Sequence, residues 1–401
     1  TFVIPRKYFL LPYVLAACFV PADQRIIVMG LDFTVLRILV VAGVLRILIY
    51  QEQIAIRWNR FDKVLFAWAF CAAVVYVFQW ADMSALINRS GFLFDVIGLY
   101  WLFRQSIRSW NDIKLVALFL ALSVFILTPL VAVELITGSN PFVFLGRVGT
   151  VVREGRYRCQ AAFPHSIILG LFWSTLLPIF IGLIGTKRRR SLYAVAACAC
   201  VFIICSTSSS TPLVTMLLVL LFMALFRFRC YGRLMAYLTC GMIVALHIVM
   251  NNPVWHLICR IDFVGGSTGW HRFILIDEAV KHFGDWALIG TRDIAHWRRG
   301  LKDITNQYVL EGVRGGFATL IIFCLLLVYA VKIPGSYSLR CAFNDRKWLS
   351  WGICVSVLGH CISFFGVSYF GQIKMLLYLT FAVVGFIAEN ELVPAQNRNL
   401  H

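Results

Sequence analysis

The run IKLVALFLALSVFILTPLVAVELI, residues 113–136, decides the fold class of this chain. Within it only Lys114 and Glu134 carry charge, and each lies close to one end of the run. About 20 mostly apolar residues are enough for an α-helix to cross a bilayer, and the residues do not alternate in polarity as they would in a barrel strand. The run therefore predicts a membrane-spanning α-helix.

Eleven other apolar runs of near-spanning length occupy most of the remaining sequence. They cover residues 8–20, 30–50, 64–80, 85–103, 165–185, 192–207, 212–226, 234–250, 315–333, 348–366 and 372–388. Only 14% of the 401 residues are charged, whereas soluble domains average about 25%. We therefore predict an all-α polytopic membrane protein with about 12 transmembrane helices.

Lysine and arginine gather in alternate short connections between these runs. With the N-terminus inside, the cytoplasmic connections contain Arg57, Arg60, Lys63, Arg104, Arg108, Lys114, residues 187–190, Arg227, Arg229, Arg233, Lys332, Arg340, Arg346 and Lys347. Cytoplasmic connections of membrane proteins carry such an excess, so we predict that both termini are cytoplasmic. The pattern also accounts for most of the formal charge of +18, so no nucleic-acid partner is implied.

Two longer segments on the external side divide the chain. Residues 1–136 hold predicted transmembrane helices 1–5, residues 137–164 an arginine-rich loop, and residues 165–250 helices 6–9. Residues 251–314 form a large external loop between helices 9 and 10, and residues 315–401 hold helices 10–12 and a cytoplasmic tail. Long loops escape the charge rule, but their arginines predict an anionic partner.

The large loop contains a predicted amphipathic helix in RFILIDEAVKHFGD, residues 272–285. Its apolar residues recur at helical spacing at Phe273, Ile276, Val280 and Phe283. Asp277 with Lys281, and Glu278 with His282, are spaced as i,i+4 pairs. We predict that the apolar face of this helix lies against the membrane surface or the top of the bundle.

The stretch KDITNQYVLEGVRGG, residues 302–316, is unusually polar for the start of a membrane-spanning run. Asp303 is placed to cap a helix that continues into the next apolar run. In that helix Gln307, Glu311 and Arg314 share one face. We predict that this face points toward the arginine-rich loop.

Charged residues also occur inside two of the apolar runs, at Asp32, Arg37, Arg89 and Asp95. A charge within a membrane is costly and usually faces a partner or a cavity. Asp32 with Arg37, and Arg89 with Asp95, are the expected structural pairs.

The 13 cysteines lie mostly in apolar runs, where a thiol behaves as a small hydrophobic group. Cys159 and Cys259 are exceptions in the two external loops, and two alternatives stay open for them: a disulfide, or two separate buried thiols. The external loops show no paired acidic motif for a metal and no glycine-rich phosphate loop. The sequence therefore predicts neither a metal site nor a cofactor.

Several short motifs follow one another across the external loops and their flanking helices. They are GRYRCQAAFPHSIILGLF at 155–172, CSTSSSTPLVTMLL at 205–218, STGWHRF at 267–273, DWALIG at 285–290, and Thr305-Asn306. In this order, over roughly residues 140–335, the chain resembles the O-antigen ligase and Wzy-type polysaccharide polymerase superfamily. The resemblance implies a glycosyltransferase of the bacterial inner membrane that uses undecaprenyl-pyrophosphate-linked glycan at the periplasmic face. Thr305 stands where ligases have histidine, which favours a polymerase over a ligase.

The resemblance also implies roles for particular side chains, because fixed positive charge must hold the pyrophosphate as it leaves the sugar. Arginine binds two phosphate oxygens at once, and the candidates are Arg156, Arg158 and Arg272. Candidate catalytic residues, which accept the proton or orient the acceptor, are His271, Glu311, Thr305 and His296. Candidates for sugar binding are Asn306, Gln307 and Tyr308. Each also has a structural alternative as an ion pair, a helix cap or an interface anchor.

The partners implied are the polyisoprenyl-pyrophosphate-linked glycan, the lipid bilayer and other polysaccharide assembly proteins. A transporter or flippase of lipid-linked sugars or small solutes is the alternative function. Transporters often carry internal repeats, whereas this chain shows no repeat and its polar groups gather at one face. A non-catalytic assembly subunit is the third reading, because a fold does not fix an activity.

Overall fold

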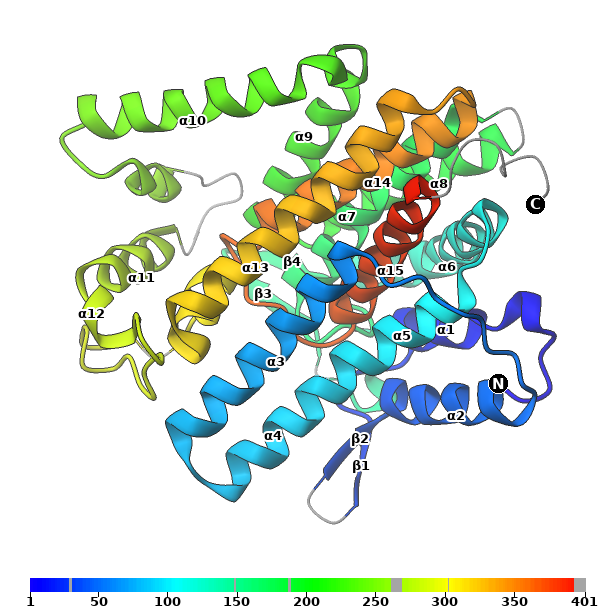
Figure 1. Cartoon of the computed structure of the whole chain (residues 1–401), viewed down its shortest axis with the longest axis horizontal. Coiled ribbons are helices and arrows are strands. Elements are labelled where there is room, and N and C mark those ends of the chain that lie inside the picture. The colour runs from blue at the N-terminus through cyan, green and yellow to red at the C-terminus, as the bar shows by residue number, and fades with distance from the viewer. Residues whose placement is uncertain (29–30, 148, 187–188, 261–268, 302, 393–401) are drawn as a thin grey trace.

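The computed structural model describes residues 1–28, 31–147, 149–186, 189–260, 269–301 and 303–392 of the chain. Within them the regular structure is almost entirely helical (Figure 1), as the sequence predicts. The helices are α1 Leu11–Phe19, α2 Val35–Ile49, α3 Arg60–Trp80, α4 Met83–Leu93, α5 Leu99–Ser106, α6 Trp110–Thr137, α7 Ser166–Ile184, α8 Arg190–Ser206, α9 Ser210–Ala224, α10 Gly232–Val249, α11 Gly269–Lys281, α12 Phe283–Trp286, α13 Gln307–Arg340, α14 Asn344–Ser363 and α15 Ile373–Leu392. The end of the predicted cytoplasmic tail, 393–401, and residues 261–268 of the large loop lie outside the described residues.

Six helical segments in the described part of the chain are long and apolar enough to cross a membrane. They are Arg60–Trp80, Trp110–Thr137, Ser166–Ile184, Ser210–Val249, Gln307–Arg340 and Ile373–Asn390. This supports a polytopic helical membrane protein. The other predicted runs also lie on helices, but α1, α2 and α8 have only 9, 15 and 17 residues. At about 1.5 Å per residue these are shorter than an apolar layer of about 30 Å, so the count of about 12 crossings stays a prediction.

Strands occur, within the described residues, in two short antiparallel hairpins. These pair β1, Arg25–Val28, with β2, Leu31–Thr34, and β3, Val151–Arg153, with β4, Arg156–Arg158. The turn between β3 and β4 consists of Glu154 and Gly155, which both have positive φ angles of 50° and 70°. Such a two-residue turn matches the twist of a hairpin, and it gives the arginine-rich loop a structure that the sequence analysis does not predict.

Local sequence explains where several long helices begin and end. Asn59 and Asp62 form a capping box at the start of α3, and Ser109 and Asp112 form another at the start of α6. In each capping box, the side chain of the first residue accepts the backbone N–H of the second residue, which the helix leaves unpaired. The side chain of the second residue accepts the backbone N–H of the first. Gly138 ends α6 with a φ of 67°, a conformation that glycine adopts without steric cost.

Helix α7 lies at the centre of the bundle and packs closely against α14. A Cβ on Gly182 would lie 2.7 Å from the carbonyl oxygen of Trp348, and one on Gly352 would lie 2.5 Å from that of Pro178. The two backbones therefore approach as only glycine allows. Small residues at such contacts are typical of helix packing in membranes, where dispersion rather than exclusion of water holds helices together.

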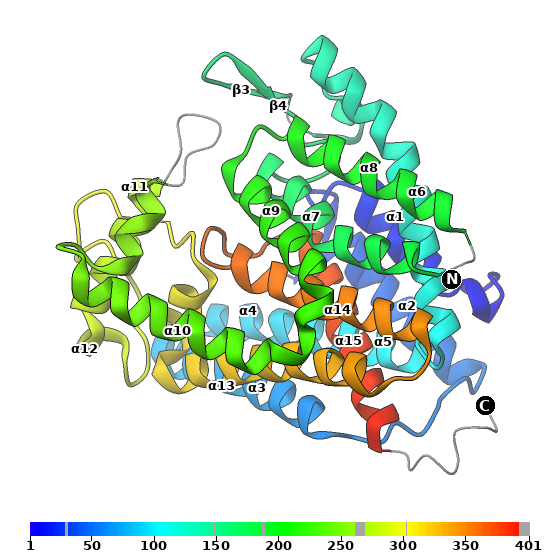
Figure 2. The same cartoon turned by 90° about the horizontal axis from the view of Figure 1, so that it is seen from above.

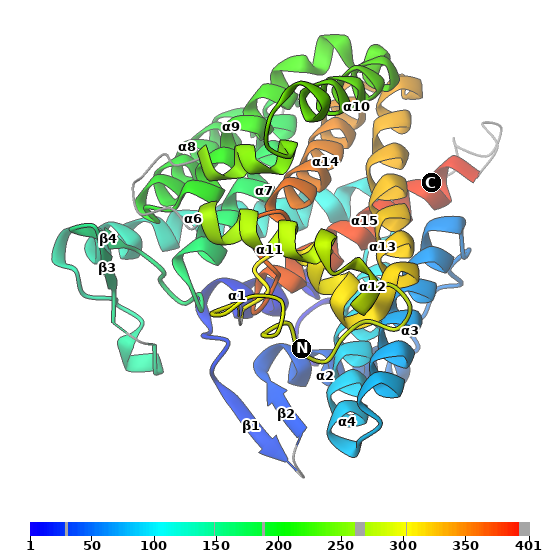
Figure 3. The ribbon, with the colours of Figure 1, turned by 90° about the vertical axis from the view of Figure 1, so that its left-hand side faces the viewer.

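The two long connections meet at one end of the bundle, which we call the loop end. Residues of β4, α11 and the segment 291–305 line a single cavity there. Figure 3 views this end, with α11 and α12 in front of the first turns of α13. The N-terminus and the last turn of α15 lie on the opposite side (Figures 1 and 2). Which end faces the cytoplasm stays a prediction.

Helix α11 confirms the predicted helix of the large loop, but a different face is buried. The ion pairs of Asp277 with Lys281 (2.6 Å) and of Glu278 with His282 (3.6 Å) form as expected. The buried residues are Gly269, Arg272, Leu275, Glu278 and Ala279. Val280 and Phe283 of the predicted apolar face are instead exposed. Leu275 and Ala279 are buried because they pack against a cluster with Trp286, Ile294 and Trp297.

Helix α13 begins one turn later than predicted and is broken inside. Its cap is Asn306, whose side-chain oxygen accepts the N–H of Val309 at 3.1 Å, and not Asp303. Further along, Gly316 has φ 73° and ψ 178°, which interrupts the helix. The N–H of Phe317 therefore bonds to the carbonyl of Ala287 (2.8 Å) instead of to its own helix. This break anchors the large loop to α13.

Candidate functional site

A cavity of about 800 Å³ opens at the loop end, and we call it the outer basin. Its lining includes many cations, namely Arg153, Arg158, Arg272, Arg292, Arg314 and Lys374. The carboxylates of Asp293 and Asp303 are the acids in that lining. Two of the three predicted phosphate-binding arginines, Arg158 and Arg272, thus share one cavity although they are far apart in sequence.

Arg158 enters the outer basin from the last residue of β4 and is only 7% exposed. Its Nη2 donates to the hydroxyl of Ser209 at 2.6 Å, in the serine-rich turn before α9, while its Nε has no partner in the described structure. Burial first, and then the charge of Arg153, lowers the pKa of Arg158. The side chain is therefore held by one contact and keeps a donor for a ligand.

Arg272 enters the outer basin from the first turn of α11 and is 8% exposed. Its Nε donates to the carbonyl of Gly366 at 3.2 Å. Burial lowers the pKa of Arg272 to about 10, with further contributions from Arg153 and Arg158. Arg272 stays charged at neutral pH, but the three guanidinium groups repel one another, and a bound anion would relieve that repulsion.

Glu134, near the end of α6, holds the chain that leads out of the β3–β4 hairpin. It is fully buried and accepts the N–H groups of Gln160 (3.1 Å) and Ala161 (2.9 Å) and the hydroxyl of Thr150 (3.0 Å). A buried carboxylate is tolerable when such donors surround it. Glu134 therefore positions Arg158, which lies two residues before Gln160.

Arg156 does not line the outer basin. It follows the hairpin turn and is exposed, and Figure 2 shows the hairpin projecting from the helices. Arg156 is therefore outside the candidate site, and it serves below as a matched control for Arg158.

His165 lines the outer basin and was not singled out from the sequence. It caps α7, with its Nδ1 accepting the N–H of Ile167 at 3.1 Å. Burial, followed by the charges of Arg158, Arg147 and Arg153, lowers the pKa of His165 to about 4. The ring is thus neutral at physiological pH with its proton on Nε2, so it can donate a hydrogen bond to a ligand.

A second cavity of about 80 Å³, the inner chamber, lies beside the outer basin between α3, α4, α13 and α15. Four residues line both cavities: Leu310, Arg314, Tyr369 and Lys374. Glu311 lines the inner chamber and accepts the indole N–H of Trp68 (2.9 Å) and the amide of Gln307 (2.7 Å). As predicted, Gln307, Glu311 and Arg314 share one face, and all three line this chamber.

Arg89 also lines the inner chamber, and its predicted pairing with Asp95 is wrong. Asp95 instead binds the guanidinium of Arg37 through two contacts, of 2.6 and 2.8 Å. Arg37 contacts Asp32 only through the backbone carbonyl of that residue. Competition between two arginines for one aspartate is settled by helix packing, which the sequence does not reveal.

The three predicted sugar-binding residues use their polar groups within the protein. Asn306 caps α13 and donates to the carbonyl of Phe365. Gln307 bridges Glu311 and the N–H of Tyr369, and Tyr308 donates its hydroxyl to the carbonyl of Cys361. Tyr308 and Asn306 line neither cavity, so their roles here are structural.

Two of the four predicted catalytic residues line a cavity, and the other two do not. Thr305 lines the outer basin, and its buried hydroxyl has no partner in the described chain. Glu311 lines the inner chamber. His271 turns to the carbonyl of Asp303 (3.3 Å), and His296 contacts Asp285 (3.1 Å). Neither histidine lines either cavity.

The cysteine question is answered for the described residues: Cys159 and Cys259 are separate free thiols. Cys159 is buried near the carbonyl of Val131, and Cys259 lies near that of Gly269. In the same part of the chain, no group of three or more His, Cys, Asp or Glu side chains is arranged to hold a metal ion.

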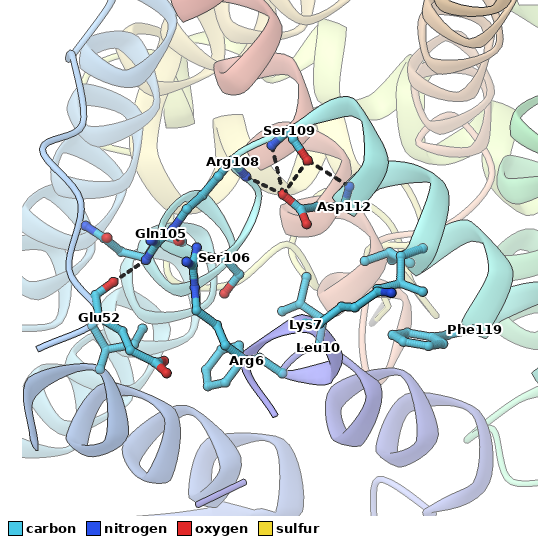
Figure 4. Close-up of a pocket in the computed structure, with 14 residues that line it drawn as sticks. Arg6, Lys7, Leu10, Glu52, Gln105, Ser106, Arg108, Ser109, Asp112 and Phe119 are labelled. Atoms are coloured by element: carbon cyan, nitrogen blue, oxygen red, sulfur yellow. Dashed lines mark hydrogen bonds between the residues drawn. The ribbon is translucent and has the colours of Figure 1, made fainter. Parts of the chain in front are cut away.

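A separate cavity of about 390 Å³ lies away from the loop end, near the N-terminus. Figure 4 shows that its polar groups contact one another. Asp112 accepts the N–H groups of Arg108 (3.0 Å) and Ser109 (2.8 Å), while the guanidinium of Arg108 reaches the carbonyls of Gln105 and Glu52. These bonds serve to cap α6 and to join α5 to the chain after α2.

The outer basin and the inner chamber together form the candidate site. Arg89 and Lys374 belong to this site, and each is a cation inside a predicted span, which is the sequence signal for a buried partner or cavity. The resemblance to the O-antigen ligase and polymerase superfamily depends on motif order alone, because no protein-family model and no curated protein matches this chain.

Proposed function

We propose that the protein is a membrane glycosyltransferase that polymerises or transfers a glycan carried on a polyprenyl diphosphate. The loop end would then face the periplasm of a bacterial inner membrane. The observation that supports this most is that Arg158 and Arg272, both buried, line one cavity. The Nε of Arg158 also has no partner among the described residues. Guanidinium groups in a site of low dielectric stabilise phosphate charge far better than they do in water.

The outer basin is large enough for this substrate. Ligand sites are commonly cavities of about 300–1,000 Å³, and the basin has about 800 Å³. The diphosphate would lie between Arg158 and Arg272, with the first sugar toward Thr305, whose hydroxyl has no partner among the described residues.

In the proposed reaction, an acceptor hydroxyl oxygen bonds to the anomeric carbon as the bond from that carbon to the diphosphate oxygen breaks. The polyprenyl diphosphate leaves with the electron pair and with its negative charge held by the two arginines. The hydroxyl proton passes to Glu311, the predicted proton acceptor that lines a cavity. The arginines supply the positive charge, so the proposed step needs no metal.

We expect Arg272→Ala to reduce turnover by about 100-fold, because loss of one preorganised donor to a developing anion typically costs that much. The purified protein in liposomes would receive lipid-linked glycan extracted from its host, and released polyprenyl diphosphate and polymer length would be measured. Arg156→Ala, on the exposed hairpin, should retain full turnover.

Normal polymer from Arg272→Ala and from Arg158→Ala would refute the proposed site. Movement of lipid-linked glycan across the bilayer without any new glycosidic bond would refute the enzyme and establish the transporter alternative.

A further inference from the structure

The inner chamber holds more positive charge than its own acid can balance. Arg89, Arg314 and Lys374 line it, and among the described residues Glu311 is the one carboxylate in the lining. Neither Arg314 nor Lys374 has an ion-pair partner among the described residues, and Glu311 already accepts bonds from Trp68 and Gln307. The positive charge in the lining of the chamber is therefore not balanced by the carboxylate of Glu311.

Arg89 is the clearest sign of a missing anion. It is 6% exposed, and its Nε and Nη2 have no hydrogen-bond partner in the described structure. Its guanidinium stacks on the ring of Tyr76 at 3.6 Å. Stacking supports the flat face of a guanidinium and leaves its edge free for an anion. A buried charge without a partner is costly, so such residues in membranes usually mark a site for a substrate or an ion.

The linings of the two cavities carry more cations than acids. Arg89 adds to the six cations of the outer basin, giving seven, and Glu311 adds to its two acids, giving three. Seven less three leaves a formal surplus of four positive charges.

We propose that the inner chamber binds the carboxylate of an acidic sugar, of the uronic acid class, through Arg89 and Lys374. This rests on the proposed function, because the sugar would belong to the glycan whose diphosphate lies in the outer basin. The chamber, of about 80 Å³, has room for several water molecules. It therefore accommodates a carboxylate but not a sugar ring, which stays in the outer basin beside Leu310 and Tyr369.

The test uses the full-length protein in lipid nanodiscs, with methyl glucuronide, methyl glucoside and farnesyl diphosphate as separate probes in calorimetric titrations. We expect wild type to bind the glucuronide at least tenfold more tightly than the glucoside. Arg89→Gln and, independently, Lys374→Gln should weaken glucuronide binding about tenfold or more, because each removes a charge-assisted hydrogen bond. Arg89→Gln, which lies outside the outer basin, should bind farnesyl diphosphate with near wild-type affinity, and Arg156→Gln should bind both probes normally.

Equal binding of the glucuronide by wild type and both chamber variants would overturn this inference, as would equal binding of glucuronide and glucoside by wild type. Failure of wild type to bind farnesyl diphosphate would count against the proposed function instead, so the two failures are distinguishable. A melting temperature of Arg89→Gln at or above that of wild type is also expected, because two buried nitrogens of its guanidinium lack a hydrogen-bond partner among the described residues. A marked decrease would show a structural role and refute the site.

Discussion

The Gly316→Ala variant is expected to lose about 3 kcal/mol or more of folding stability and to release the large loop from α13. Gly316 has φ 73° and ψ 178°, a region of backbone space that only glycine occupies readily. A Cβ there would also lie 2.5 Å from the carbonyl oxygen of Leu288. That oxygen is backbone and cannot rotate away, so either α13 or the segment around Leu288 must move.

Thermal unfolding in detergent measures the loss, and limited proteolysis reports whether the large loop is released. Gly284→Ala is the matched control, since it lies in the same loop, within α12, and a Cβ there meets nothing within 4 Å. We expect the control to change stability by no more than about 0.5 kcal/mol, as is usual for exposed sites. Similar melting and cleavage of the two variants would contradict this account of the break in α13.

Glu134→Ala is expected to cost about 3–5 kcal/mol, because it leaves several buried donors without an acceptor. The N–H groups of Gln160 and Ala161 would both lose their partner. Since this segment directly follows Arg158, the variant should also disorder the wall of the outer basin that carries that arginine.

The stability of Glu134→Ala can be compared with that of Arg156→Ala, which changes an exposed side chain of the neighbouring hairpin. A loss below about 1 kcal/mol for Glu134→Ala would show that water or another group satisfies these donors. Proteolysis between residues 140 and 160 should increase only in the Glu134 variant.

The helices were predictable because apolar runs of spanning length have few alternatives. The run at 113–136 is contained in α6, Trp110–Thr137, and its flanking Ser109 and Gly138 mark the ends by ordinary capping chemistry. The start of α13 was harder to predict from the sequence, because Asp303 and Asn306 are both good helix caps. The choice of Asn306 depends on a contact with Phe365, which is distant in sequence.

The buried face of a helix and the surroundings of a charged side chain were harder to predict than the helices themselves. In α11 the predicted apolar stripe and the observed buried stripe are both compatible with a helix, and only the neighbours Trp286 and Trp297 decide between them. Arg156 and Arg158 are equivalent in composition, but the unpredicted hairpin exposes the first and buries the second. The arginine content of the external loops therefore favoured an anion site without revealing which arginines would form it.

The central claim is that Arg158 and Arg272 hold a diphosphate together, and titration of the purified protein with farnesyl diphosphate tests it most directly. We predict that Arg158→Gln and Arg272→Gln each weaken binding by about tenfold to 100-fold, because each removes a hydrogen bond to a charged group worth about 1.5–3 kcal/mol. Arg156→Gln should bind as wild type does. Equal affinity of all three variants and wild type would contradict the claim.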